Sequence, residues 1–312
     1  MTRILFYLDG FPHEPWEKAL KAMDSAIEFR GYPDWGAPED GPAYAVVWEP
    51  KAGLLAEYPN LKAVFSLGAG IDHITCDASV PEHLPIIRMG DNGLKEGMAE
   101  YVLMTVLMHH RHMPNFLAQQ RRAVWRRASS KAASSVRVGI MGYGALGQSA
   151  AAALKPVGYD IAAWSARTKP AEEGISHFTG PAMLKEFLAR TDILVCLLPE
   201  TDITIGLLGA ENLAALPKGA SVINAGRGSL IDLAALEGAL DSHHLSGATL
   251  DVVSKEPLEA KHPLWQHEKV IITPHIAAIT RTETAANYII DNINQMELGK
   301  PAQNMLNRKR GY

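Results

Sequence analysis

The amino-acid sequence predicts an α/β protein built from two doubly wound parallel-sheet domains. Three observations support this fold class. Strand-like apolar runs alternate with helical segments along the chain, and the alternation starts a second time near residue 136. A glycine-rich turn, GYGALG at residues 142–147, lies in the middle of the chain. The length of 312 residues also exceeds what one ordinary hydrophobic core spans.

The first part of the chain carries the patterns of one complete set of strands and helices. Residues 31–42 are rich in glycine, proline and acidic side chains, and are therefore expected to form a connecting loop. A long helix over residues 94–113, stopped by Pro114, and a second helix over residues 115–127 lead to the second part. The other predicted elements are strands at 3–8, 44–48, 63–67 and 85–88 and helices at 16–29 and 51–57.

The glycine-rich turn opens the second set. It follows an apolar strand at residues 136–141 and precedes an alanine-rich helix at 148–154. The run 192–198 carries almost no polar residue, which is typical of a central parallel strand. Other expected elements are strands at 160–164, 220–224, 248–253 and 270–273 and helices at 181–189 and 230–240.

The final helix, residues 282–298, comes after the second sheet is complete. We therefore expect the chain to return to the first domain at its end. The predicted domains are residues 1–93 together with 281–312, and residues 94–280 inserted between them.

Composition and charge restrict the class of protein. The chain is 47% hydrophobic and 21% charged, and its net charge of −4 argues against general nucleic-acid binding. Cys76 and Cys196 are too few for a disulfide framework, which favours a reducing compartment. No signal peptide is recognisable, and the apolar stretch at residues 101–108 is too short to cross a bilayer. We expect a cytoplasmic protein that does not insert into membranes.

The turn at residues 142–147 has the spacing of a dinucleotide-binding fingerprint. Gly142 allows the tight turn, Gly144 lets the backbone approach a pyrophosphate, and Gly147 lets the helix pack closely on the sheet. The helix N-terminus that includes Ala145 and Leu146 directs its N–H groups toward the phosphates. A glycine-rich turn without a ligand is the alternative, and the flanking strand and helix favour the nucleotide site.

The strand at residues 160–164 ends without the acidic residue that usually binds the ribose 2′-OH of NAD. Ser165, Arg167 and Lys169 stand there instead. An arginine at this place accommodates a 2′-phosphate, which a carboxylate would repel. NADPH is therefore the expected cofactor and NADH is possible. The alternative is that Arg167 and Lys169 only belong to a solvated loop.

Reactive side chains follow three of the predicted strands, at the edge where ligands bind in open α/β sheets. Arg227 lies between two glycines, and its guanidinium can hold a carboxylate and polarise the neighbouring carbonyl. His275 would protonate a ketone oxygen as a general acid. Glu256 would favour the imidazolium and raise the pKa of His275 above the free value of about 6.5. A surface arginine in a tight turn and a structural histidine are the alternatives.

An ordered series of motifs resembles the D-isomer-specific 2-hydroxyacid dehydrogenase family. These motifs are the fingerprint, LPET at 198–201 with Thr204, NAGRG at 224–228, Asp251-Val252 with EPL at 256–258, and Pro274-His275. Within the family, other segments are similar to the bacterial glyoxylate/hydroxypyruvate reductase A group. These segments are residues 46–48, 63–72, 263–267 and 271–281 and the terminal Arg310-Gly311-Tyr312. The resemblance covers nearly the whole chain.

The resemblance implies a Rossmann domain inserted into a flavodoxin-like substrate domain. It implies Arg227, Glu256 and His275 as catalytic residues, and reduction of glyoxylate or hydroxypyruvate to the D-2-hydroxy acid. It also implies a homodimer built on the nucleotide-binding domain with its helix at 94–113. The implied cofactor contacts are Leu198, Pro199, Thr204, Ala225, Gly226, Asp251 (near the nicotinamide carboxamide) and Ala277. The implied substrate contacts are Trp48, Leu67, Gly68, Ala69, Gly70, Arg227 and His275.

One position departs from the family. Ala166 stands where related reductases often carry arginine, which leaves the 2′-phosphate to Arg167 and Lys169. Alternatives to glyoxylate reduction are a larger 2-oxo acid with NAD(H), phosphonate or formate chemistry, and a nucleotide-sensing binding protein without catalysis.

We expect no metal site, because the histidines at 109, 110 and 112 have no carboxylate or cysteine beside them. The basic run at residues 121–131 around Trp125 is expected to be a solvated or dimer surface.

Overall fold

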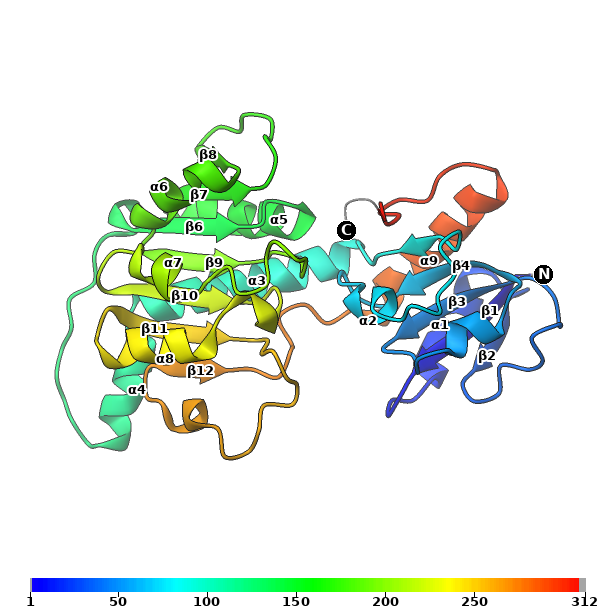
Figure 1. The fold of residues 1–312 in the computed structure, drawn as a ribbon, viewed down its shortest axis with the longest axis horizontal. Coiled ribbons are helices and arrows are strands. Elements are labelled where there is room, and N and C mark those ends of the chain that lie inside the picture. Colours follow the sequence, from blue (N-terminus) through cyan, green and yellow to red (C-terminus); the bar gives the residue numbers. More distant parts are fainter. Residues whose placement is uncertain (1, 309–312) are drawn as a thin grey trace. The chain divides into compact units, whose positions relative to one another are not determined.

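The computed structural model describes residues 2–308 and divides into two compact units (Figure 1). Unit 1 runs to Leu94 and resumes at Ile279, and unit 2 spans Lys95–Ala278. The terminal motif at residues 310–312 lies outside the described residues. Among the described residues, no helix has both the length and the apolar character that a membrane span needs.

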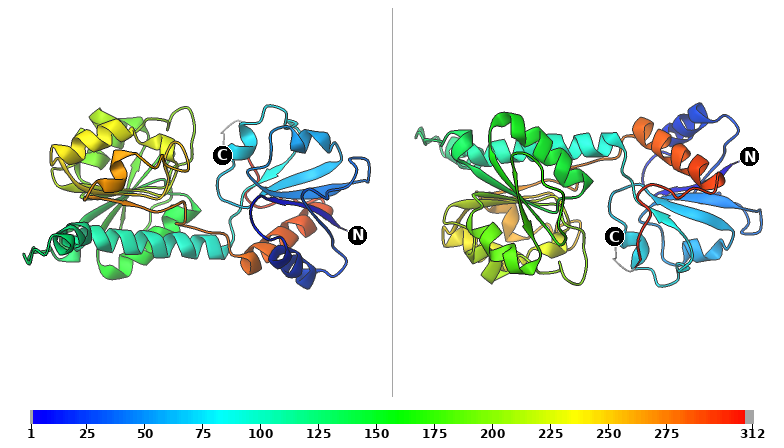
Figure 2. Two further views of the ribbon diagram at one scale, coloured as in Figure 1. Left: turned by 90° about the horizontal axis from the view of Figure 1, so that it is seen from below. Right: turned by 90° about the horizontal axis from the view of Figure 1, so that it is seen from above.

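Unit 1 is a parallel sheet with helices on both faces (Figure 2). Its strands are β1 (Arg3–Leu8), β2 (Glu28–Gly31), β3 (Ala43–Trp48), β4 (Leu61–Ser66) and β5 (Ile86–Ile87). Its helical segments are α1 (Glu14–Met23), η1 (Leu54–Glu57), α2 (Asp72–Thr75) and α9 (Thr282–Glu297). The strand order β2-β1-β3-β4-β5 with all neighbours parallel is the flavodoxin-like order.

The last helix packs within unit 1, as the position of α9 in the sequence indicates. Ala286 and Ile289 are fully buried on its inner face. Near its end, Glu297 accepts a hydrogen bond from the Tyr44 hydroxyl at 2.7 Å and pairs with Lys62 at 2.6 Å. These contacts join the two ends of the chain in one unit.

The predicted helix at residues 16–29 is wrong in its second half. The helix α1 ends at Met23, and Glu28–Gly31 form the edge strand β2. Trp16 and Leu20 form the buried face of α1, and the backbone leaves the helical conformation at Asp24, which is extended. Parallel pairing with β1 and an ion pair between Arg3 and Glu28 at 3.0 Å hold this short segment in the sheet.

Unit 2 is a seven-stranded parallel sheet. Its strands are β6 (Arg137–Met141), β7 (Asp160–Ser165), β8 (Ile175–Thr179), β9 (Ile193–Cys196), β10 (Ala220–Asn224), β11 (Leu245–Leu250) and β12 (Val270–Ile272). The order is β12-β11-β10-β9-β6-β7-β8. The chain moves outward from β6 to β8 and then continues from β9 on the other side, so β6 and β9 enclose the topological switch point of a Rossmann fold.

Helices cover both faces of this sheet (Figure 2). The longer ones are α3 (Asn92–His110), α4 (Met113–Arg121), α5 (Ala145–Leu154), α6 (Leu184–Ala189), α7 (Ala210–Ala214) and α8 (Leu233–Asp241). Short 3-10 turns are η2 (Ala133–Ser135), η3 (Lys155–Val157), η4 (Pro181–Met183), η5 (Gly228–Leu230) and η6 (Pro263–Gln266). One core contains buried residues of α3 and α5, such as Val102 and Leu154. The other contains residues of α6, α7 and α8, such as Phe187 and Leu236.

Several predicted boundaries in unit 2 need correction. Pro114 does not stop the long helix, because α3 already ends at His110 and Pro114 lies in the first turn of α4. A proline is tolerated there, since the first N–H groups of a helix have no acceptor within it. The helix α4 ends at Arg121 instead of residue 127. The edge strand β8 and the one-turn helix α7 were not expected, because neither carries a long periodic apolar pattern.

Candidate active site

The predicted site residues of unit 2 follow the carboxyl ends of neighbouring strands. His275 lies beyond β12, Asp251 and Glu256 beyond β11, and Arg227 beyond β10. Leu198 follows β9, the glycine-rich turn follows β6, and Arg167 follows β7. Because all seven strands are parallel, these segments lie along one edge of the sheet.

The glycine-rich turn has the backbone that a dinucleotide needs. Gly142 has a φ of +106°, and a Cβ there would lie 2.7 Å from the Leu197 carbonyl oxygen. A Cβ at Gly147 would lie 2.1 Å from the Gly142 carbonyl oxygen, so the helix packs directly on the turn. The Cβ position of Gly144 meets no atom within 4 Å, which leaves room for a pyrophosphate. The helix α5 begins at Ala145, and its N-terminal N–H groups therefore start inside the fingerprint.

The turn after β7 presents positive charge. Ser165 is buried, and its hydroxyl donates to the Arg167 carbonyl oxygen at 2.6 Å, so this hydroxyl shapes the turn. Arg167 is exposed and Lys169 is half-buried. The β7 strand that carries them pairs with β6, which leads into the glycine-rich turn. This donor set fits a phosphate at the ribose 2′ position.

Internal hydrogen bonds hold the loop that follows β9. The Thr204 hydroxyl accepts from the Thr201 N–H at 2.8 Å and donates to the Pro199 carbonyl oxygen at 2.7 Å. A Cβ at Gly226 would lie 2.8 Å from the Leu198 carbonyl oxygen, so this loop contacts the loop that carries Arg227. Ala225 and Gly226 are buried at this contact.

The loop around Arg227 is fixed by the buried Asn224. The Asn224 side chain donates to the Arg227 carbonyl oxygen at 2.9 Å and accepts from the Gly226 N–H at 3.2 Å. The Arg227 guanidinium is half-buried and donates to the Gly226 carbonyl oxygen at 2.8 Å. A Cβ at Gly228 would lie 1.8 Å from the Val253 carbonyl carbon. The absence of a side chain at Gly228 thus lets Arg227 approach the segment that carries Glu256.

Glu256 and His275 form a carboxylate–imidazole pair. The distance from Glu256 Oε2 to His275 Nδ1 is 2.8 Å. The hydrogen bond to Glu256 is the main cause that raises the pKa of His275 above its ordinary value of 6.5, against partial burial and the nearby Arg227. Burial by itself would raise the pKa of Glu256, but the hydrogen bond to His275 and the neighbouring positive charges outweigh it and lower that pKa. The pair therefore favours the imidazolium form of His275.

The backbone at His275 is unusual. Its φ of +55° lies in the left-handed region, which costs a non-glycine residue about 1–3 kcal/mol. The His275 N–H donates to the Asp251 carbonyl oxygen at 2.8 Å. Asp251 is buried, and its carboxylate accepts from the N–H groups of Ile276 and Ala277, each at 2.9 Å. Asp251 therefore holds the whole turn that carries the imidazole.

Two residues that sequence reasoning missed complete this arrangement. The Thr273 hydroxyl donates to Asp251 Oδ1 at 2.6 Å. The Tyr101 hydroxyl of α3 lies 2.6 Å from the Thr273 hydroxyl. The position of Thr273, directly before Pro274-His275 at a strand end, is a signal in the sequence. Tyr101 carries no such signal, because it is separated from Thr273 by 172 positions.

In unit 1, the loop at Leu67, Gly68, Ala69 and Gly70 follows β4. The Leu67 N–H donates to the Val47 carbonyl oxygen at 2.9 Å, and the Gly68 N–H donates to the Ser66 hydroxyl at 3.1 Å. Within the described part of the chain, no acceptor faces the N–H groups of Ala69 and Gly70. Only these two of the four predicted donors are thus available to a carboxylate.

Trp48 lies against this loop. A Cβ at Gly68 would lie 2.4 Å from Trp48 Cζ3, so a larger residue there would require the indole ring to move. The ring centroids of Trp48 and His73 are 4.5 Å apart. Trp48 and the loop therefore pack together within unit 1, and their role as substrate contacts stays a prediction.

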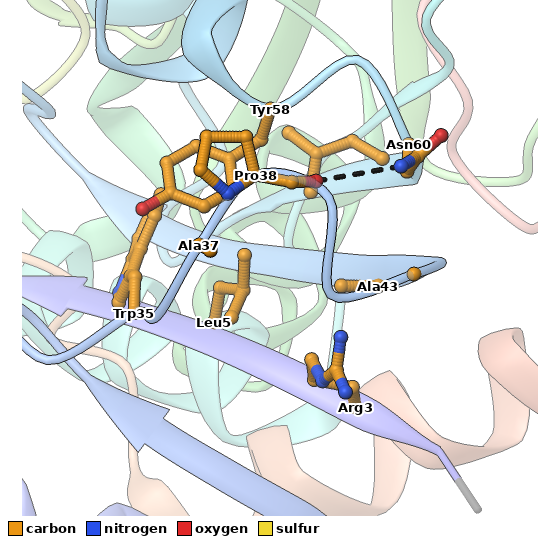
Figure 3. A pocket seen from close by; sticks show the side chains of 10 residues that line it. Arg3, Leu5, Trp35, Ala37, Pro38, Ala43, Tyr58 and Asn60 are labelled. Atoms are coloured by element: carbon orange, nitrogen blue, oxygen red, sulfur yellow. Dashed lines mark hydrogen bonds between the residues drawn. The ribbon is translucent and has the colours of Figure 1, made fainter.

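Neither of two hollows in unit 1 is lined by a predicted site residue. Figure 3 shows the smaller, of about 10 Å³, where the Asn60 amide donates to the Pro38 carbonyl oxygen at 3.4 Å. It is lined by Arg3, Leu5, Trp35, Ala37, Pro38, Gly41, Ala43, Tyr58, Asn60 and Leu61. The larger has a volume of about 250 Å³ and is lined by Tyr7, Leu8, Asp9, Gly10, Phe11, His13 and Tyr32.

The histidines of the long helix have structural contacts. Burial lowers the pKa of His109 to about 4, and its Nε2 lies 2.8 Å from the Thr249 hydroxyl. The ring of His110 lies 2.8 Å from the Tyr159 hydroxyl and 2.9 Å from the Lys131 carbonyl oxygen. No cluster of three or more metal-ligating side chains occurs within residues 2–308.

Comparison with known proteins identifies the family of this chain. Residues 103–277 match the family model for the D-isomer specific 2-hydroxyacid dehydrogenase, NAD binding domain. The chain is 39% identical over 315 aligned residues to glyoxylate/hydroxypyruvate reductase A of Salmonella heidelberg, with 99% of each chain covered.

Solved structures share the fold over the whole chain. A D-isomer specific 2-hydroxyacid dehydrogenase from Xanthobacter autotrophicus, solved with NADPH and MES, has a TM-score of 0.94 at 41% identity and covers 100% of this chain and 99% of its own. The NADPH-dependent glyoxylate/hydroxypyruvate reductase from Sinorhizobium meliloti, solved with NADP and sulfate, has a TM-score of 0.92 at 35% identity and full coverage of both chains. The chain therefore belongs to the D-isomer specific 2-hydroxyacid dehydrogenase family and groups with the glyoxylate/hydroxypyruvate reductase A proteins.

Proposed function

We propose that this protein reduces glyoxylate and hydroxypyruvate to glycolate and D-glycerate with NADPH. The observation that carries the proposal is the pair of Glu256 and His275, 2.8 Å apart, at the strand edge that also carries Arg227. The names of the relatives from Salmonella heidelberg and Sinorhizobium meliloti support the substrates and the cofactor.

Each residue has a definite task in this proposal. Bound NADPH supplies the hydride that reaches the carbonyl carbon. His275 holds a proton on Nε2 and donates it to the carbonyl oxygen, while Glu256 stabilises the imidazolium. Arg227 binds the substrate carboxylate with two parallel hydrogen bonds and polarises the adjacent carbonyl. The N–H groups of Ala69 and Gly70 are proposed as further carboxylate donors.

The cofactor contacts are proposed on the same edge. The fingerprint N–H groups would bind the pyrophosphate, and Arg167 with Lys169 would bind the 2′-phosphate. Because both oxygens of Asp251 already accept backbone N–H groups, we assign its main role to the turn that carries His275.

The direct test is oxidation of NADPH, followed by absorbance, in the presence of single 2-oxo acids. Turnover with glyoxylate or hydroxypyruvate, and slower turnover with bulky 2-oxo acids, is expected. Preference for a bulky 2-oxo acid with NADH would favour the alternative substrate class. Tight nucleotide binding without turnover on any 2-oxo acid would instead favour a nucleotide-sensing protein.

Removal of the charge of Glu256 is expected to change the pH profile of reduction. The imidazolium of His275 is the proton donor, so kcat/KM falls as pH rises through the pKa of His275. In Glu256→Gln the main cause that raises this pKa is gone, while burial and Arg227 still lower it. The falling limb of kcat/KM against pH should therefore move to lower pH. An unchanged limb would show that another group controls the profile.

Arg167 is expected to set the preference for NADPH. In Arg167→Ala, loss of a charge-assisted hydrogen bond to the 2′-phosphate should raise the KM of NADPH by about 10- to 100-fold. The KM of NADH should stay within about twofold, because NADH has no phosphate there. Lys185→Ala, which removes an exposed positive charge elsewhere in unit 2, is the control. Equal losses for both nucleotides would argue against the assignment.

We also propose a cytoplasmic homodimer that is built on unit 2. Large apolar side chains are exposed on α3, on α4 and directly after it, namely Met104, Met113, Leu117, Val124 and Trp125. Burying these side chains against a second copy would remove apolar surface from water. Light scattering on the eluting protein should give twice the chain mass of 33.9 kDa.

A further inference from the structure

We propose that Tyr101 and Thr273 are positioning residues, which act through Asp251 to hold the imidazole of His275 in its productive orientation. This inference rests on the proposed role of His275 as proton donor. Neither hydroxyl is assigned to the substrate or the cofactor.

The two hydroxyls donate in sequence, Tyr101 to Thr273 and Thr273 to Asp251. A carboxylate only accepts, so the Thr273 hydroxyl donates to Asp251 Oδ1 at 2.6 Å. The Thr273 oxygen then accepts from the Tyr101 hydroxyl at 2.6 Å. Burial raises the pKa of Tyr101, so the phenol keeps the proton that it donates. Tyr101 and Asp251 are 6% and 3% exposed and Thr273 between them is half-buried, so both ends of this chain of bonds are shielded from competing water.

The same carboxylate determines where the imidazole lies. Asp251 receives the N–H groups of Ile276 and Ala277, and its own carbonyl oxygen receives the N–H of His275. Only Pro274 separates Thr273 from His275. The Asp251 carboxylate bonds to Thr273 before the proline and to the N–H groups of Ile276 and Ala277 after it, so it holds the backbone on both sides of Pro274. This support keeps His275 in its left-handed conformation with Nδ1 directed at Glu256.

Tyr101 connects this turn to the long helix. It belongs to α3, and it packs in the same core as Val102 and Val106. The hydroxyl therefore ties the end of β12 to a rigid helix on one face of the sheet. A side chain without the hydroxyl would still fill the core but would leave Thr273 without its donor.

The first test compares Thr273→Val, which keeps the shape and removes the hydroxyl, with Thr273→Ser, which keeps the hydroxyl. In Thr273→Val the kcat for glyoxylate should fall by about tenfold to a hundredfold, because small displacements of a catalytic group cost that much. The KM of NADPH should stay within about twofold, since most nucleotide contacts lie on other loops. Thr273→Ser should restore most of the kcat.

The matched control is Thr249→Val. Thr249 is a fully buried threonine of the adjacent strand β11, and its hydroxyl contacts His109 instead of the site. For Tyr101→Phe the matched control is Tyr159→Phe, because the hydroxyl of Tyr159 contacts His110 instead of the site. The control variants should keep kcat within about twofold of the wild type. Equal losses in Thr273→Val and Thr249→Val would overturn the inference.

An activity-independent measurement separates this inference from the proposed function. The imidazole signals of His275 in NMR spectra should shift or broaden in Thr273→Val and Tyr101→Phe but not in the controls. If the wild-type enzyme shows no turnover, the proposed function fails while these signals still test the positioning. If His275 signals are unchanged in both variants, the positioning role is refuted even when turnover is confirmed.

Discussion

Replacement of His275 by alanine is expected to lower kcat for glyoxylate reduction by about 10²- to 10⁴-fold, the usual contribution of a positioned general acid. The variant removes the imidazolium, which is the member of the Glu256–His275 pair that carries a transferable proton at neutral pH. NADPH should still bind with a dissociation constant within about threefold of the wild type, because the fingerprint and the loop after β7 are untouched. Steady-state kinetics and fluorescence titration of NADPH measure the two quantities.

The control for this prediction is His112→Ala. His112 has a φ of +57°, close to the +55° of His275, so the variant introduces alanine into a similar left-handed backbone. His112 Nε2 lies 3.2 Å from the Ser129 carbonyl oxygen, at a loop that carries no predicted site residue. Its kcat should stay near the wild-type value. Loss of NADPH binding in His275→Ala would indicate a structural role, and retained turnover would mean that another group donates the proton.

Replacement of Gly147 by alanine is expected to destroy nucleotide binding and to destabilise the protein by about 3 kcal/mol, because overpacking of a close backbone contact is costly. The added Cβ would lie 2.1 Å from the Gly142 carbonyl oxygen, and backbone atoms cannot move away as a flexible side chain can. The helix α5 would have to shift off the turn and withdraw its first N–H groups from the proposed phosphate site. Chemical denaturation and NADPH titration measure both effects.

The matched control is Gly238→Ala in α8. Gly238 is also a helical glycine, but the position of its Cβ meets no atom within 4 Å. Alanine there should stabilise the protein by about 0.5–1 kcal/mol, because it has the higher helix propensity. Similar destabilisation at both glycines would show that the close contact in the fingerprint is not the cause.

The fold was largely predictable because its signals are local. Strands and helices alternate along the chain and have different apolar periods. Each strand of a parallel sheet must be followed by a connection that returns to the start of the next strand. The two sets of elements therefore define two doubly wound sheets. The edge strand β2 is the instructive failure. Its four residues, Glu28–Gly31, carry two charged side chains and no periodic pattern, and only pairing with β1 makes them a strand.

In the candidate site, too, some features follow from the sequence and others only from the folded structure. The sequence by itself determined that Arg227, Glu256 and His275 follow strand ends, and parallel topology then brings strand ends to one edge. It could not determine that two of the four N–H groups at Leu67–Gly70 are already bonded, or that Asp251 holds the turn of His275. Those facts depend on which hydrogen-bond partners meet after folding, such as Tyr101 with Thr273, 172 positions apart. Periodicity and glycine turns are encoded in neighbouring residues, whereas the pairing of distant polar groups exists only once tertiary packing has placed them within 3 Å of one another.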